Sequence, residues 1–152
     1  MKTLVIIPTY NEEGSLKRVI ESLVLACPII DYLIVNDGLT DETASVCRDQ
    51  GYPSLDLPVN LGLSDAFQTG MKYAYRHNYD CAIQLDADGQ HQPEYIEKLI
   101  DAIEHKDIVI GSRFIHSKKP LPLRMIGSSF LSAAIEMALF HKVAYHLPRV
   151  SL

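Results

Sequence analysis

The chain has 152 residues, of which 47% are hydrophobic and 22% are charged, and its formal net charge is -5 at pH 7. A chain of this length and composition is expected to fold into a domain with its own hydrophobic core, which excludes an intrinsically disordered protein. The mild negative charge argues against a nucleic-acid partner, because proteins that bind nucleic acids usually present a basic surface.

Short apolar runs in the first 114 residues have the composition of β-strands. Four of them are rich in Ile and Val and nearly continuous, as is typical of parallel strands that are buried on both faces. These four runs are TLVIIP at residues 3–8, YLIVN at 32–36, CAIQLD at 81–86 and DIVIG at 107–111. A weaker candidate strand is SLDLP at residues 54–58.

Amphipathic segments alternate with these runs and predict helices between the strands. The expected helix starts are Asn11, Asp41, Ser64 and Pro93, and Gly51 is expected to end the second helix. The side chains expected on buried helix faces are Leu16, Val19, Ile20 and Leu23 in the first helix, Ala66, Phe67, Gly70, Met71 and Ala74 in the third, and Ile96, Leu99, Ile100 and Ile103 in the fourth.

The alternation of strands and helices predicts an α/β fold with a mostly parallel central sheet. In such a sheet, ligands bind beyond the carboxyl ends of the strands. The segments that follow the candidate strands are polar, and they are TYNE at residues 9–12, DG at 37–38, DADGQ at 86–90 and SR at 112–113. We therefore expect these segments to gather at one edge of the sheet.

The DADGQ segment predicts either a metal site or an ordinary turn. Two carboxylates that are one residue apart cannot both be buried without partners, because an unpaired buried charge is costly. The side-chain oxygens of Asp86, Asp88 and Gln90 are the kind of ligand that Mg²⁺ and Mn²⁺ prefer. A bare Asp-x-Asp pattern is also common in solvated turns before a helix, so the neighbouring motifs are what favour the metal site.

The segments after the first two strands also allow two interpretations. Pro8 fixes a turn, the ring of Tyr10 offers a flat face to a base, and Glu12 lies where a helix is expected to begin. After the second strand, Asp37 can accept a hydrogen bond from a ring N–H of uracil or guanine. A turn followed by a helix cap explains the first of these segments equally well.

Five motifs taken together carry a resemblance to a known family. IIPTYNEE, VNDGLTDET, NLGLSDAFQTG, DADGQHQPE and GSRF follow one another between about residues 3 and 114. In this order and spacing they resemble the family 2 glycosyltransferases, and most closely the dolichyl-phosphate mannose synthases and bacterial polyprenyl-phosphate sugar transferases. The resemblance implies a nucleotide-diphospho-sugar transferase fold of the GT-A, Rossmann-like type. It also implies an inverting transfer from a UDP- or GDP-sugar to a lipid phosphate or a glycan, with Mg²⁺ or Mn²⁺ as cofactor.

The same resemblance implies a role for each residue that matches a motif. The residues that it places at the nucleotide-sugar are Pro8, Tyr10, Glu12, Val35, Asp37, Asp86, Ala87, Asp88 and Arg113. The metal ligands that it implies are Asp86, Asp88 and Gln90, and Asp88 has the catalytic role. Arg124 is a looser match to a second basic residue that faces phosphate.

The sequence departs from the family pattern at particular positions. Asn36 stands where many relatives have an aspartate, and Leu39 replaces a serine. Leu63 occupies a position that is often basic in relatives, which removes a positive charge near the expected diphosphate. We interpret His91 as a polar turn residue and not as a catalytic base.

The second part of the chain sets a limit on the expected function. Residues 1–114 match a nucleotide-sugar-binding core, whereas residues 115–152 read as a basic loop, an amphipathic helix and a short tail. Family members continue into an acceptor-side part that this chain is expected to lack. The alternative to an active transferase is therefore an inactive nucleotide-sugar-binding or interaction module.

The sequence also bears on the cellular location. The apolar run at residues 125–140 is shorter than a membrane span, although a helix there can lie on a membrane surface. The N-terminus does not read as a signal peptide. Cys27, Cys47 and Cys81 are scattered without metal spacing, as is typical of reduced buried thiols. These features predict a cytoplasmic protein, and a peripheral association with the membrane is an alternative that they leave open.

Overall fold

The computed structural model describes residues 1–38, 41–90 and 92–111. Its centre is a parallel sheet with the strand order β3-β2-β1-β4. The strands are β1 (Thr3–Thr9), β2 (Asp31–Asn36), β3 (Ser54–Asp56) and β4 (Cys81–Gln84). The helices are α1 (Glu13–Ala26), α2 (Thr43–Gln50), α3 (Leu63–Arg76), the short 3₁₀ helix η1 (Pro93–Tyr95) and α4 (Ile96–Ile103). The predicted α/β class with a mostly parallel sheet is confirmed.

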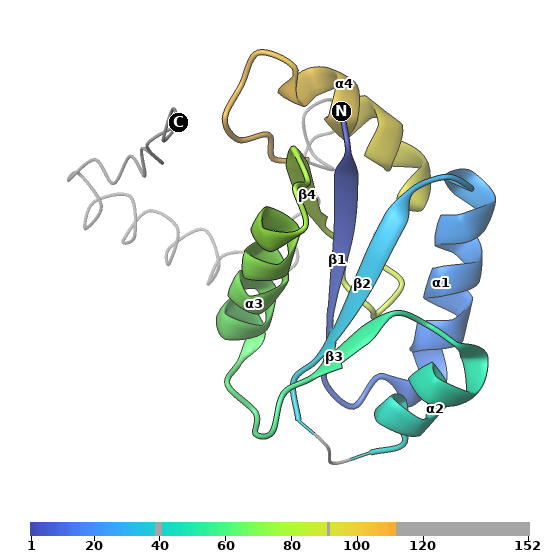
Figure 1. Cartoon of the computed structure of the whole chain (residues 1–152). Helices are drawn as coiled ribbons and strands as arrows, with labels where there is room; N and C mark the ends of the chain where they lie inside the picture. The colour runs from blue at the N-terminus through green and yellow to red at the C-terminus, as the bar shows by residue number, and fades with distance from the viewer. Residues whose placement is uncertain (39–40, 91, 112–152) are drawn as a thin grey trace, which may run out of the picture. The chain divides into compact units, whose positions relative to one another are not determined.

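The helices cover both faces of the sheet. Figure 1 shows α3 on one face and α1 and α2 on the other. The alternation of side chains along β1 explains these layers, because successive strand residues point to opposite faces. Val5 and Ile7 pack with the buried stripe of α1, whereas Leu4 and Ile6 pack with α3. Both faces of β1 are therefore core, as its continuous apolar run predicts.

Helix α1 has the buried face that its sequence predicts, but it begins differently. Leu16, Val19, Ile20 and Leu23 are its buried residues. The prediction of Asn11 as the cap is wrong, because Asn11 adopts a left-handed backbone with φ of 56°. The chain turns at that residue, and the helix then begins at Glu13 with Glu12 as its N-cap.

Helix α3 also begins before its predicted cap. The helix starts at Leu63, and its N-cap is Gly62, which has φ of 91°. Ser64 therefore lies inside the helix, where its side chain does not cap it. The predicted inward residues Ala66, Gly70 and Ala74 are buried. The other two expected inward residues, Phe67 and Met71, are less buried, and Met71 is 41% exposed.

The other predicted helices lie close to their expected positions. Helix α2 ends at Gly51, which has the left-handed φ of 67° that favours glycine at a C-cap. It starts two residues after Asp41, whose carboxylate accepts hydrogen bonds from the main-chain N–H (3.1 Å) and the hydroxyl (2.8 Å) of Thr43. Pro93 opens η1, which continues directly into α4. Of the expected stripe of α4, Ile96 is buried, and the other three members are half-buried.

The prediction of a strand at residues 107–111 is wrong. These residues form no strand in the structure, and Ile108 and Ile110 are 75% and 83% exposed. A strand exists only where its main chain pairs with a neighbour, and within the described residues β4 pairs with β1 alone. The predicted run at 81–86 is likewise shorter, because β4 ends at Gln84 and its side chains are only partly buried.

The second part of the chain lies outside the described residues. The predicted boundary at residue 114, the basic loop and the amphipathic helix therefore stay predictions. Within the ranges that the structure describes, no helix is both long enough and apolar enough to span a membrane.

Candidate functional site

The carboxyl ends of the strands meet at one edge of the sheet. The register pairs Thr9 with Asn36, and Asn36 in turn with Asp56. Beyond these pairs, the main-chain N–H of Asp37 donates to the carbonyl of Thr9 at 2.8 Å. Because β4 ends beside Ile6, the segment that follows it leaves the sheet earlier than the others. The parallel strands thus place the segments after β1, β2 and β4 beyond the same edge of the sheet, and Figure 1 shows the loops after β1 and β2 at the lower end of the strands.

The segment after β4 forms a tight turn with its carboxylates at different depths. Asp86 is half-buried, and its Oδ1 accepts a hydrogen bond from Nε2 of Gln84 at 2.9 Å. Ala87 is buried and anchors the turn to the core. Asp88 is exposed, and its Oδ1 accepts a hydrogen bond from the main-chain N–H of Gln90 at 2.8 Å. Asp88 and Gln90 therefore stand on the open side of the turn.

The turn offers oxygen donors to a cation but not a complete set of ligands. Within residues 1–38, 41–90 and 92–111, no three His, Cys, Asp or Glu side chains are arranged to hold a metal ion. The carboxylate of Asp88 and the amide oxygen of Gln90 are exposed donors of the type that Mg²⁺ and Mn²⁺ prefer. Such cations commonly keep water and substrate phosphates as their remaining ligands. The chemistry of the donors fits this arrangement.

The residues expected around the base lie at different depths. Tyr10 is 45% exposed, so its ring is accessible to a ligand. Pro8 and Val35 face each other in the sheet register and are both buried, so the structure does not expose the side chain of either to a ligand. Glu12 is half-buried at the start of α1, and its carboxylate accepts a hydrogen bond from the hydroxyl of Ser15 at 2.6 Å.

Asp37 has partners that the sequence did not indicate. The residue is 3% exposed, and its two carboxylate oxygens accept hydrogen bonds from the main-chain N–H groups of Leu61 and Gly62, each at 2.7 Å. The partners lie in the segment that joins β3 to α3. No local signal predicts this contact, because more than twenty residues separate Asp37 from its partners.

Three loops converge next to Asp37. A Cβ atom placed on Gly38 would lie 3.4 Å from the main-chain nitrogen of Asn60 and 3.6 Å from Cε2 of Tyr10. The loop after β1, the loop after β2 and the β3–α3 segment therefore approach one another at this glycine. Gly38 has φ of 118°, a conformation that glycine adopts much more readily than other residues.

Asn36, one of the expected departures from the family pattern, is fully buried. Its Nδ2 donates a hydrogen bond to Oδ1 of Asp56 at 3.1 Å. An aspartate there would place a second carboxylate against Asp56, so an amide suits this pair. The other sequence-predicted residues, Arg113, Arg124, Leu39 and His91, lie outside the described residues.

A separate pocket lies at the opposite, amino-terminal edge of the sheet. Its volume is about 220 Å³. The residues that line it are Leu4, Ile30, Asp31, Tyr32, Pro53, Tyr73 and Tyr79. The hydroxyl of Tyr79 donates to Oδ2 of Asp31 at 3.0 Å. Burial, together with this hydrogen bond and the nearby carboxylate charge, raises the pKa of Tyr79 to about 12. The pocket holds none of the predicted donor-site residues.

Known proteins that are similar to the chain agree with the predicted family. The family model described as glycosyl transferase family 2 matches residues 4–148. The chain is 35% identical over 121 residues to polyprenol monophosphomannose synthase of Mycolicibacterium smegmatis, with 75% of this chain and 46% of that protein covered. It is 36% identical over 124 residues to undecaprenyl-phosphate mannosyltransferase of Micrococcus luteus, with coverages of 78% and 51%. The chain thus spans about half the length of these relatives.

Solved structures show the same fold. Glucosyl-3-phosphoglycerate synthase from Mycobacterium tuberculosis, in complex with Mn²⁺, uridine diphosphate and glucosyl-3-phosphoglycerate, matches with a TM-score of 0.57 and 20% identity. The match covers 70% of this chain and 40% of that one. S. aureus TarS matches with a TM-score of 0.53 and 23% identity, covering 68% and 19% of the two chains. The fold is therefore the predicted GT-A type, and the chain belongs to glycosyl transferase family 2.

Proposed function

We propose that this chain carries the donor-binding part of an inverting glycosyltransferase. The donor is a UDP- or GDP-sugar, and the acceptor is a polyprenyl phosphate. The observation that carries the proposal is the family match over residues 4–148, and it is supported by the position of the predicted donor segments directly after the parallel strands β1, β2 and β4. Relatives whose names specify polyprenol, undecaprenyl-phosphate or dolichol-phosphate as the lipid support a lipid-phosphate acceptor over a glycan.

In the proposed reaction, a phosphate oxygen of the acceptor forms a bond to the anomeric carbon of the sugar. The bond from that carbon to the diphosphate breaks on the opposite face, and the nucleoside diphosphate leaves with the electron pair. The acceptor is already anionic, so this attack needs no strong general base. A sugar hydroxyl as acceptor would need one. A lipid acceptor would also bring the protein to a membrane surface.

Within this proposal, the exposed ring of Tyr10 contacts the base, and the turn of residues 86–90 faces the diphosphate. Asp88 and Gln90 would hold a divalent cation, with half-buried Asp86 as a further ligand or a sugar contact. When bound there, Mg²⁺ or Mn²⁺ supplies charge neutralisation for the departing diphosphate. The Mn²⁺ and Mg²⁺ complexes of the glucosyl-3-phosphoglycerate synthase that shares the fold support this cofactor by analogy.

A second candidate function is a nucleotide-sugar-binding or interaction module without transfer. The chain covers 46% and 51% of the two bacterial mannosyl enzymes and 35% of dolichol-phosphate mannosyltransferase of Pyrococcus furiosus. The donor segments lie in the covered part, so such a module would keep donor binding.

One experiment separates these two functions. The whole chain is titrated with UDP-sugars and GDP-mannose by calorimetry, with and without Mn²⁺, and nucleotide release is then measured with a short polyprenyl phosphate. The transferase predicts metal-dependent binding and acceptor-dependent release of nucleoside diphosphate. Binding without release supports the module, and no binding of any donor contradicts both functions.

The role of Asp88 is tested by the Asp88→Asn variant. It is expected to weaken donor binding in Mn²⁺ by roughly tenfold, which corresponds to about 1.4 kcal/mol. Asp101→Asn is the matched control, because it removes the same charge from an exposed position on α4. Equal donor affinities for the two variants would contradict a metal-binding role for Asp88.

A further inference from the structure

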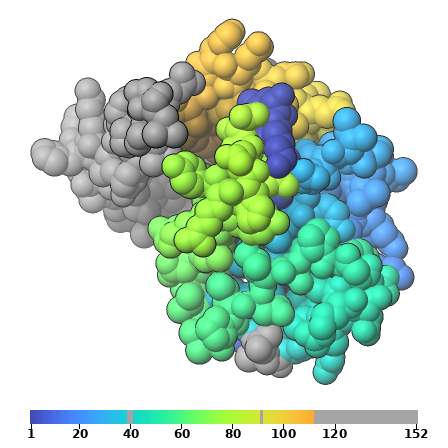
Figure 2. Space-filling model, in the orientation of Figure 1, coloured from blue at the N-terminus to red at the C-terminus, as the bar shows by residue number. Residues whose placement is uncertain are grey.

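The pocket at the amino-terminal edge of the sheet combines aromatic rings with a carboxylate. Its charged lining residue is Asp31, and its apolar lining residues are Leu4, Ile30 and Pro53. The rest of its lining consists of three tyrosines, Tyr32, Tyr73 and Tyr79. Figure 2 shows the green atoms of α3 next to the light-blue atoms of β2, and both elements contribute lining residues. A volume of about 220 Å³ holds a ligand larger than a water molecule.

Asp31 brings a negative charge to this pocket. Its Oδ2 accepts a hydrogen bond from the hydroxyl of Tyr79 at 3.0 Å. A carboxylate can accept several hydrogen bonds, so this one bond leaves Asp31 able to accept more. The residue is exposed, and a ligand in the pocket can therefore reach the carboxylate.

The three tyrosine rings are held by their neighbours. The ring of Tyr73 stacks on the ring of His77, with the two centroids 3.9 Å apart. The ring of Tyr32 meets the ring of Tyr52 edge-on, with the centroids 6.4 Å apart. The third ring is held by its hydrogen bond to the carboxylate. Because the rings are already ordered, a ligand would immobilise few side chains, which lowers the entropic cost of binding.

An ammonium group already lies on one of these rings. The Nζ atom of Lys2 is 4.0 Å from the ring centroid of Tyr79, and it donates a hydrogen bond to the carbonyl of His77 at 3.0 Å. The face of an aromatic ring attracts a cation through its quadrupole. Lys2 does not line the pocket, so this ammonium does not fill it.

The charge of Asp31 selects the class of ligand. A neutral apolar ligand would cover the carboxylate without offering it a hydrogen bond, and such desolvation is costly. An anion would be repelled by the carboxylate. A protonated amine instead offers N–H donors to the carboxylate and a positive charge to the rings. Its carbon chain can pack on the apolar lining residues.

We propose that this pocket is a ligand site separate from the donor segments, and that its ligand is a small protonated alkylamine. The N–H groups of the amine donate to Asp31, and its positive charge lies against the tyrosine rings. The site shares no residue with the donor segments, so it is independent of the proposed glycosyltransferase function.

The site is tested by NMR on the whole chain at constant ionic strength. The chain is titrated with n-butylammonium chloride and, separately, with n-butanol, which has the same carbon chain without the charge. We expect saturable shifts of the Asp31, Tyr73 and Tyr79 signals with butylammonium and none with butanol. Equal shifts with butanol would show an apolar pocket and overturn the proposal. The absence of saturable shifts with butylammonium would overturn it as well.

Asp31→Asn and Asp49→Asn are a matched pair of variants for the charge. Asp31→Asn should raise the dissociation constant of butylammonium by roughly threefold to fivefold, because it removes the carboxylate from the pocket. Asp49 is exposed on α2 and does not line the pocket, so Asp49→Asn should leave the constant unchanged. Equal constants for the two variants would show non-specific binding of the amine to an acidic surface, which contradicts the proposed site.

Tyr73→Leu and Tyr75→Leu test the aromatic rings in the same way. Both tyrosines are in α3, but Tyr75 is 84% exposed and does not line the pocket. Tyr73→Leu should raise the dissociation constant by roughly twofold to fivefold, and Tyr75→Leu should not change it. An unchanged constant in folded Tyr73→Leu would remove the rings from the site and overturn the proposal. If Tyr73→Leu does not fold, the two aspartate variants decide the proposal.

Discussion

At the scale of single residues, the turn of residues 86–90 lies against the side chain of Arg18 in helix α1. Gly89 has φ of 75°, a left-handed conformation in which a side chain is strained. A Cβ atom at Gly89 would lie 3.0 Å from Nη2 of Arg18. Glycine at this position therefore allows both the turn and the close approach of the guanidinium. The turn that carries Asp88 and Gln90 is shaped by the contact as well as by its own sequence.

Gly89→Ala should destabilise the folded chain by about 1–2 kcal/mol, mainly through the left-handed backbone. The contact adds to this loss, so the cost should be smaller in an Arg18→Ala background, where only the backbone strain remains. Urea unfolding of the two single variants and the double variant measures the difference. Lys17→Ala is the control background, because Lys17 is a neighbouring exposed cation that pairs with Glu21. A cost that is the same in all three backgrounds would contradict packing of Arg18 on the turn.

The site shows which residue roles a sequence can predict. The turn of residues 86–90 follows a strand in one continuous stretch, so its position at the sheet edge was predictable from the local pattern. The partners of Asp37 were not, because they depend on how β2 and the β3–α3 segment meet in three dimensions. The sequence showed an available acceptor, and only the fold shows which donors reach it.

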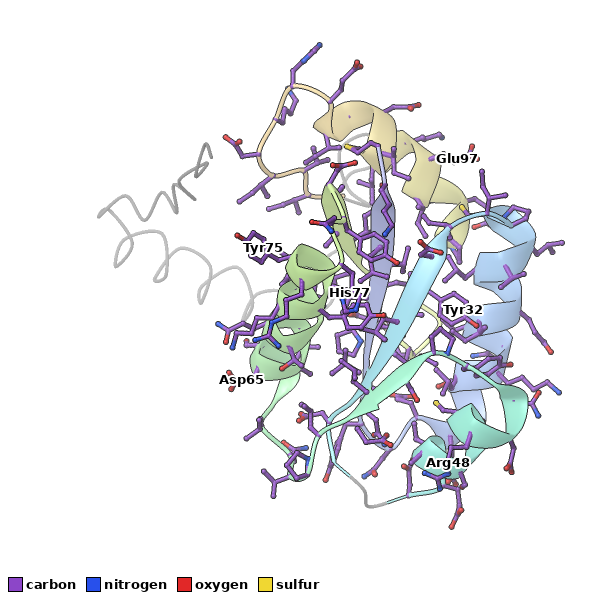
Figure 3. All side chains as sticks on the ribbon, in the orientation of Figure 1. Tyr32, Arg48, Asp65, Tyr75, His77 and Glu97 are labelled. Carbon is purple, nitrogen blue, oxygen red and sulfur yellow. The ribbon has the colours of Figure 1, made fainter. Side chains whose placement is uncertain are left out.

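At the scale of elements, α3 packs closely on β1 through a glycine. A Cβ atom on Gly70 would overlap Cγ2 of Ile6 and lie 3.0 Å from its Cγ1 and Cδ1. Helix and strand can approach this closely because position 70 has no side chain. Figure 3 shows the opposite side of α3, where Asp65 and Tyr75 point away from the sheet.

Gly70→Ala should destabilise the chain by roughly 1–3 kcal/mol, because an extra methyl in a packed core forces its neighbours to move. Gly14→Ala should instead stabilise α1 by about 0.4–1 kcal/mol, since alanine suits a helix better. A Cβ atom on Gly14 meets nothing within 4 Å. The two free energies of unfolding are measured by urea denaturation. If Gly70→Ala lowers the free energy of unfolding less in an Ile6→Ala background than in the wild type, the clash is confirmed. Equal changes in the free energy of unfolding for Gly70→Ala and Gly14→Ala would contradict it.

The elements also show where sequence patterns succeed and fail. The buried face of α1 was predictable because the helix period is a local property that four apolar residues reveal. The run at residues 107–111 has the same apolar character as β1, yet Ile108 and Ile110 are exposed. A strand depends on an adjacent strand for its hydrogen bonds. The sequence of residues 107–111 does not show whether such an adjacent strand is present.

At the scale of the whole molecule, several cysteines and tyrosines that are buried or half-buried have a raised pKa and so ionise only at higher pH. Burial is the main cause of the raised pKa of the thiols of Cys27, Cys47 and Cys81 and the phenols of Tyr32 and Tyr52. The pKa of Tyr79 rises furthest, to about 12. In each case the folded chain favours the protonated form.

The direction of the pH dependence follows from linkage. A raised folded pKa gives stability that is fully present below the unfolded pKa and is lost as the pH rises toward the folded value. The loss should therefore begin near pH 9.0 for the thiols and near pH 10.0 for the tyrosines. For Tyr79 it should continue to about pH 12. The whole chain should lose stability steadily through this alkaline window.

Tyr79→Phe isolates the largest of these contributions. At pH 8 the variant should be less stable than the wild type, because the hydrogen bond to Asp31 is missing. Between pH 10 and 12 this difference should narrow, since only the wild type must ionise a phenol at that position. Urea midpoints at pH 8, 10 and 11 measure the difference. Tyr75→Phe, on an 84% exposed tyrosine, is the control. A constant difference between wild type and Tyr79→Phe across the series would contradict the raised pKa and its cause.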